Sequence, residues 1–140
     1  MPFREKSAWI MSLGLLLGGT IYFGVVIAKT VQLGELVSPR LPLVVIFSIV
    51  LVLVAIIGHA LAAALAPKDA AAGIDERERR IITLAGHLSA YIFGFGVVMS
   101  LGWYLFSYNG DLLFYGVFAS LMLGQLAEYV VQIFLYRTRI

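Results

Sequence analysis

Hydrophobic residues fill four long stretches of the chain, and few polar positions interrupt them. The stretches are Ala8 to Ala28, Pro42 to Leu65, Ile81 to Phe106 and Leu112 to Tyr136. A helix needs about 20 mostly apolar residues to cross a bilayer, and each stretch meets that length. The pattern predicts an all-α integral membrane protein, a four-helix bundle that occupies residues 1–140 as a single transmembrane domain.

Polar residues, glycine and proline mark the connections between these stretches. Lys29 to Leu41 forms the first, Ala66 to Arg80 the second, and "SYNGD" (Ser107 to Asp111) a tight turn. Asp75 stands three residues before Glu78, which is the spacing of a helix capping box. The third helix is therefore expected to have Asp75 as its N-cap.

Basic residues divide unevenly between the two ends of the expected bundle. Two, Lys29 and Arg40, fall in the first connection, and the rest fall near the termini or in the second connection: Arg4, Lys6, Lys68, Arg77, Arg79, Arg80, Arg137 and Arg139. Because cytoplasmic segments carry the excess of Lys and Arg, both termini are expected in the cytoplasm, an N-in and C-in topology.

Composition agrees with a membrane protein and excludes several function classes. Hydrophobic residues make up 61% of the chain, and the mean hydropathy is +0.98. The chain has no cysteine, which excludes disulfides, thiolate ligands and iron–sulfur sites. With a net charge of +2 and no basic face, direct binding of nucleic acid is not expected.

Short repeated segments suggest that the two helical hairpins are similar. "FGVV" occurs at 23–26 and again at 95–98, and "GHALA" from Gly58 parallels "GQLAE" from Gly124. Helices that run in the same direction carry each pair, as in membrane folds built from parallel repeats.

Small and polar residues recur at helical spacing within each span. Such residues turn toward other helices in a membrane, so we expect them to face the bundle interior. The expected inward residues are Ala55, His59, Ala62 and Ala66 in the second helix, Thr83, His87, Ala90 and Gly94 in the third, and Gln125, Glu128 and Gln132 in the fourth. Helix packing is expected through Gly14, Gly18, Gly86, Ala90 and Gly94.

Three ionisable side chains form the candidate intramembrane site. At 1.5 Å per residue, His59 and His87 lie roughly 9 Å from the cytoplasmic ends of their helices, and Glu128 roughly 12 Å. Gln125 and Gln132 flank that glutamate. The three could share one layer and hold a first-row metal, or the histidines could ligate a b-type haem. Alternatives without a cofactor are a proton or ion relay, a site for a polar headgroup, and hydrogen bonding that only stabilises helix packing.

The segment "DERERR", Asp75 to Arg80, has two interpretations. It is a helix start with the positive charge that orientation requires, or a cytoplasmic docking surface made by Arg77, Arg79 and Arg80.

Three segments resemble an uncharacterised family of small four-helix bacterial inner-membrane proteins. They are "FREKSAWI" (Phe3 to Ile10), "DERERRI" (Asp75 to Ile81) and "EYVVQIFLYR" (Glu128 to Arg137). Members are often encoded beside helix-turn-helix regulators, so the resemblance implies a regulatory partner and a multi-pass protein of a bacterial (or archaeal) plasma or inner membrane. It implies no catalytic residue.

Two hypotheses of function follow. The favoured one is a non-enzymatic membrane protein that acts through helix association with a partner, as a regulatory or accessory subunit or with its own copy. The other is a small cofactor-binding or transport protein built on His59, His87 and Glu128.

Overall fold

Four long helices make up the protein in the computed structural model, which describes residues 3–65, 67, 71 and 73–138. They are α1 (Phe3–Leu33), α2 (Leu41–Leu65), α4 (Glu76–Ser107) and α5 (Gly110–Arg137). Each is long and apolar enough to cross a membrane, and the described residues contain no strand. The prediction of an all-α, multi-pass membrane protein is confirmed.

The helices extend beyond the apolar stretches that predict them. Charged first turns belong to α1 and α4, because a helix continues into the headgroup region where its polar side chains are solvated. Gly34, at φ +71°, ends α1, so the first connection covers only 34–40. Asp75 caps α4 by accepting the Glu78 N–H at 2.6 Å, which confirms the expected cap.

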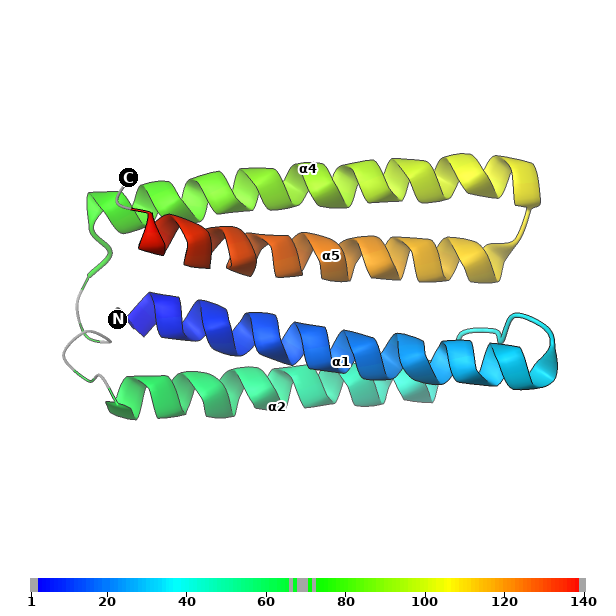
Figure 1. The fold of residues 1–140 in the computed structure, drawn as a ribbon, viewed down its shortest axis with the longest axis horizontal. Helices are drawn as coiled ribbons and strands as arrows, with labels where there is room; N and C mark the ends of the chain where they lie inside the picture. The colour runs from blue at the N-terminus through cyan, green and yellow to red at the C-terminus, as the bar shows by residue number, and fades with distance from the viewer. Residues whose placement is uncertain (1–2, 66, 68–70, 72, 139–140) are drawn as a thin grey trace.

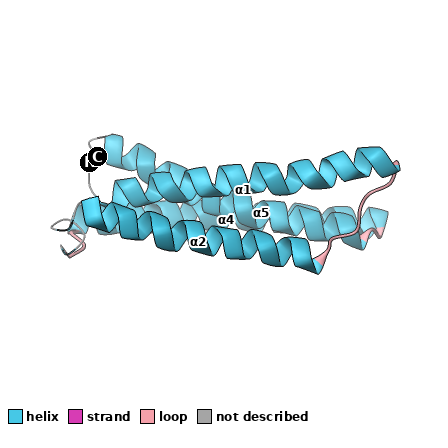
Figure 2. Ribbon diagram, turned by 90° about the horizontal axis from the view of Figure 1, so that it is seen from below, coloured by secondary structure: helices cyan, strands magenta, loops and turns pink. Residues whose placement is uncertain are grey.

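The helices lie side by side in the order α4, α5, α1, α2, and each runs antiparallel to its neighbour (Figure 1). Figure 2 shows the same four helices from a second direction, all running along one long axis. Extensive contacts join α4 to α5, α5 to α1, and α1 to α2. The bundle is therefore an open row with α2 and α4 at its edges, and both chain termini lie at one end (Figure 1).

Glycines and serines face each other where α4 packs on α5. A Cβ added at Gly96 of α4 would collide with Ser120, and one added at Gly116 of α5 would meet Ser100 Oγ at 2.5 Å. Each serine hydroxyl donates to the carbonyl of the glycine four residues before it, at 2.8 Å in α4 and 2.6 Å in α5. The serines are thus satisfied within their own helices, and the glycines let the two backbones approach closely.

Aromatic rings fill the core at the end of the row away from the termini. Tyr22 of α1 lies 5.5 Å from Phe47 of α2 and 4.9 Å from Phe118 of α5, measured between ring centroids. Tyr115 adds a hydrogen bond from its hydroxyl to the Val37 carbonyl at 2.8 Å, which holds the first connection against α5. Three helices are joined by this cluster.

The packing prediction for glycines holds in α1. A Cβ added at Gly14 would lie 2.9 Å from Val54, and one at Gly18 would lie 3.0 Å from Phe47, so both glycines pack against α2.

In α4 the predicted packing residues do not pack against another helix of the described chain. Ala90 and Gly94 are exposed, and a Cβ at Gly86 or Gly94 would meet no atom within 4 Å in the part of the chain that the structure describes. The physical reason is that α4 stands at the edge of the row and turns its other face, with Ile81, Ala85 and Ser89, toward α5.

Candidate functional site

A polar network joins all four helices at the end of the row that holds both termini. It starts from one turn of α1, where Arg4, Glu5 and Ser7 each reach a different helix. Arg4 Nε donates to the Glu78 carboxylate of α4 at 3.0 Å. Glu5 contacts α5, and Ser7 contacts α2. α4 and α2 are the outer helices of an open row, so this turn of α1 connects both outer helices to the central pair α1 and α5.

Glu5 forms an ion pair with Arg137 at the end of α5. The Arg137 Nε lies 3.3 Å from Glu5 Oε1, and the carboxylate side chain is only 8% exposed. The same guanidinium lies over the ring of Trp9, 5.5 Å from its centroid. The arginine therefore neutralises a buried charge and also covers an aromatic side chain.

His59 of α2 is held by two hydrogen bonds. Its Nδ1 lies 2.6 Å from the Ala55 carbonyl, and its Nε2 lies 2.5 Å from Ser7 Oγ of α1. A backbone carbonyl only accepts, so the Nδ1 carries the proton and the Nε2 accepts from the serine hydroxyl. Both ring nitrogens are engaged, and the imidazole acts as a link between helices. The expected inward face of α2 is confirmed for Ala55, His59 and Ala62, while Ala66 lies outside the described residues.

Glu128 lies half-buried on α5 and accepts a hydrogen bond from Gln132 Nε2 at 3.3 Å. Gln132 is buried, as expected for an inward polar residue, whereas Gln125 is exposed. Of the two glutamines that flank Glu128 in the sequence, only Gln132 bonds to the carboxylate. The partner of Glu128 is therefore a residue one turn later in the same helix, and not a histidine.

The hypothesis of one layer shared by His59, His87 and Glu128 does not hold. His59 belongs to α2 and His87 to α4, which are the opposite edges of the row with two helices between them (Figure 1). No group of three His, Cys, Asp or Glu residues suited to a metal ion occurs among the described residues. The sequence left open whether the two histidines meet, and the structure separates them, because equal depth along two helices does not make those helices neighbours.

His87 lies on the outer face of α4, opposite the face that packs on α5. The side chains of Thr83 and His87 are exposed there. No hydrogen bond or ion pair joins His87 to any other residue that the structure describes. A polar group in this position is costly in hydrocarbon, which makes the outer face of α4 a candidate contact surface.

The polar network itself was not predicted. Of its residues in α1, only Arg4 has a predicted role, as one of the basic residues that set the orientation. One signal in the sequence points to their role: acidic residues in the first turns of α1 and α4 share an end of the bundle with basic residues near both termini. Three segments, at 3–10, 75–81 and 128–137, contribute all four charges of the two ion pairs.

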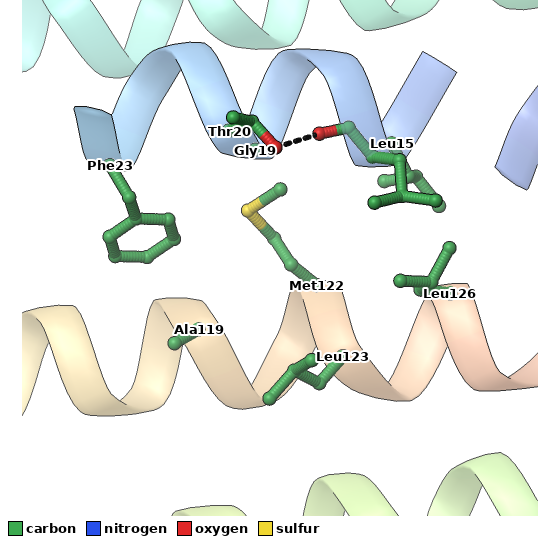
Figure 3. A pocket seen from close by; sticks show the side chains of 9 residues that line it. Leu15, Gly19, Thr20, Phe23, Ala119, Met122, Leu123 and Leu126 are labelled. Carbon is green, nitrogen blue, oxygen red and sulfur yellow. Dashed lines mark hydrogen bonds between the residues drawn. The ribbon is translucent and has the colours of Figure 1, made fainter. Parts of the chain in front are cut away.

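Several cavities open beside α5. One, of about 330 Å³, lies between α1 and α5, where the Met122 side chain reaches toward Gly19 (Figure 3). Its lining is almost wholly apolar. The single polar side chain there, Thr20, donates to the Leu16 carbonyl of its own helix at 2.7 Å. This cavity offers a ligand few groups to recognise beyond an apolar surface.

Another cavity, of about 430 Å³, lies where the charged first turn of α4 meets its apolar part. Its lining combines charged and apolar side chains from α4 with one residue of α5: Glu76, Arg77, Arg80, Ile81, Leu84 and Leu135. Two of the three arginines expected to dock a partner thus line a cavity, and Arg79 does not.

Comparison with known proteins adds no assignment: no protein-family model, no curated protein and no solved structure matches this chain.

Proposed function

We propose that this integral membrane protein is not an enzyme and acts through helix association, and that a partner helix packs on the outer face of α4. One observation carries the proposal: His87 is exposed inside a span and bonds to no other residue that the structure describes. It lies about 9 Å beyond Ile81, where the apolar part of α4 begins. A partner helix would give this imidazole a hydrogen bond in place of lipid.

The shape of the same face supports close approach of a second helix. Ala90 and Gly94 follow His87 at spacings of three and four residues, and both are exposed. Small residues at this spacing let two backbones come close enough for van der Waals contact along their length. On the opposite face of α4, glycines and serines already achieve this with α5.

A second copy of this chain is the partner that we assign to the face. In a twofold dimer with its axis along the membrane normal, the two copies of His87 lie at equal depth. A neutral imidazole has one donor nitrogen and one acceptor nitrogen, so two copies can bond each other. A regulatory or accessory role for the dimer is consistent with the family resemblance of the three segments described above.

The chain has no cysteine, so disulfide trapping can test the proposal directly. Val98→Cys places a thiol on the outer face of α4, and Val52→Cys places one on α2 with similar exposure. In lipid vesicles at low protein content, Val98→Cys is expected to form a dimer on oxidation and Val52→Cys is not. Adding Gly94→Leu should abolish the trapped dimer, while Gly24→Leu on α1, where a Cβ also meets no described atom, should leave it intact.

Equal trapping at both positions, or trapping that survives Gly94→Leu, would refute the contact. A different result would be that no dimer is trapped and that another membrane protein co-purifies and is lost with Gly94→Leu. The outer face of α4 would then still be the contact surface, but its partner would be that protein and not a second copy.

A further inference from the structure

The cavity between α4 and α5 at the terminal end of the row has the composition of a lipid site. Arg77 and Arg80 lie at its charged side, and Ile81, Leu84 and Leu135 form its apolar wall. The two kinds of lining meet at the point where the apolar part of α4 begins. Lipid headgroup and acyl chain meet at the same level of a bilayer.

We propose that this cavity binds an anionic phospholipid of the leaflet at the terminal end of the bundle, with its phosphate on Arg77 and Arg80 and an acyl chain along Leu84 and Leu135. Guanidinium groups suit phosphate because they present several N–H donors in one plane. The apolar wall supplies the surface for the first methylenes of the chain, which a soluble phosphate would leave uncovered.

Charge complementarity selects an anionic lipid over a neutral one. Glu76 is the one acidic residue of the lining, so the two arginines leave a net charge of +1. Nearby, Arg79 on another side of α4 adds further positive potential. Basic residues beside a membrane surface attract anionic headgroups through the same field. The other acidic residue of this turn, Glu78, is already paired with Arg4 at 3.0 Å and lies outside the lining.

This site adjoins the helix contact proposed above, because Arg80 lies seven residues before His87 on α4, and it differs in reaching Leu135 of α5. The test variants still separate the two proposals. Gly94 lies about 21 Å along α4 from Arg80, so Gly94→Leu should abolish dimer trapping and leave lipid binding unchanged.

Native mass spectrometry of the full chain in mild detergent tests the proposal, with phosphatidylglycerol and phosphatidylcholine as probes. The protein is expected to retain phosphatidylglycerol preferentially. The double variant Arg77→Gln/Arg80→Gln should weaken this binding about tenfold or more, since each basic residue near an anionic surface contributes measurably. Arg79→Gln removes the same charge from a residue outside the lining, so it should change the affinity less than about twofold.

A second variant separates a lipid from a free anion. Leu84→Trp narrows the apolar part of the cavity without changing any charge, and it should weaken phosphatidylglycerol binding while circular dichroism shows unchanged helix content. Equal effects of Arg79→Gln and of the double variant would overturn the site in favour of diffuse surface attraction. So would equal retention of phosphatidylcholine, or binding that Leu84→Trp leaves intact. A protein that co-purifies and is lost only with Arg77→Gln/Arg80→Gln would replace the lipid as occupant.

Discussion

Glu5 of α1 and Arg137 of α5 form an ion pair across 132 positions of the chain, with Nε and Oε1 3.3 Å apart. The pair is asymmetric, because the carboxylate side chain is 8% exposed and the guanidinium-bearing side chain 63%. Removing the arginine leaves a buried charge without its partner, while removing the carboxylate leaves an arginine that water and headgroups solvate.

We therefore expect Arg137→Ala to lower the free energy of unfolding by roughly 1–2 kcal/mol, well below the value for a fully buried pair because Arg137 is exposed. Glu5→Gln should cost less. Unfolding in mixed micelles measures both, with Arg79→Ala as the control for loss of one exposed positive charge. A larger loss for Glu5→Gln than for Arg137→Ala would contradict this account.

Among the described residues, the link between Ser7 and His59 is the only side-chain hydrogen bond between α1 and α2. Ser7→Ala should lower stability by about 0.5–1.5 kcal/mol, as for other interhelical hydrogen bonds in membranes. In a double-mutant cycle with His59→Leu, the second change should add less in the Ser7→Ala background than in the original protein. Strict additivity of the two changes would show that the 2.5 Å contact contributes nothing.

The close contact between Gly96 of α4 and Ser120 of α5 leaves no room for a larger side chain at position 96. Gly96→Ala should destabilise the hairpin by roughly 1–3 kcal/mol, because the new methyl group collides with Ser120. Gly102→Ala is the matched control on the same helix, since a Cβ there meets no described atom within 4 Å. Adding Ser120→Gly to Gly96→Ala should restore part of the loss. Equal effects of Gly96→Ala and Gly102→Ala in thermal unfolding would show that the close approach is not needed.

The fold was predictable because a transmembrane helix can be recognised from a local stretch of sequence alone. Each apolar stretch is long enough to span a bilayer, and Asp75, three residues before Glu78, marks the start of α4. The order in which the four helices lie side by side has no such local signal. Thr83, His87 and Gly94 share a face in any helix, but whether that face meets α5 or lipid depends on where α4 stands in the row. This is why the inward stripe was correct for α2 and wrong for α4.

The candidate intramembrane site could be predicted only in part, because the order of the helices was not predictable. His59 and Gln132 are placed inward as their surroundings imply, since a polar group in a span seeks a partner. Which partner it finds depends on tertiary contacts such as Ser7, 52 positions away. Glu5 was the least predictable residue, because a charge in a first turn is usually solvated and only the position of Arg137 buries it.

Orientation in the membrane gives the last prediction. Both termini lie at one end of the row, and the connection at 34–40 lies at the other (Figure 1). The excess of Lys and Arg at the terminal end predicts that this end is cytoplasmic. Glu35 and Gly73 are exposed residues at opposite ends, and the absence of native cysteine leaves any introduced thiol as the only one. In intact cells, a membrane-impermeant maleimide should label Glu35→Cys, whereas Gly73→Cys should react only after the membrane is permeabilised. The reverse pattern would place the termini and the arginine-lined cavity on the outer side. Labelling of both before permeabilisation would show a mixed orientation, with two populations of the protein in one membrane.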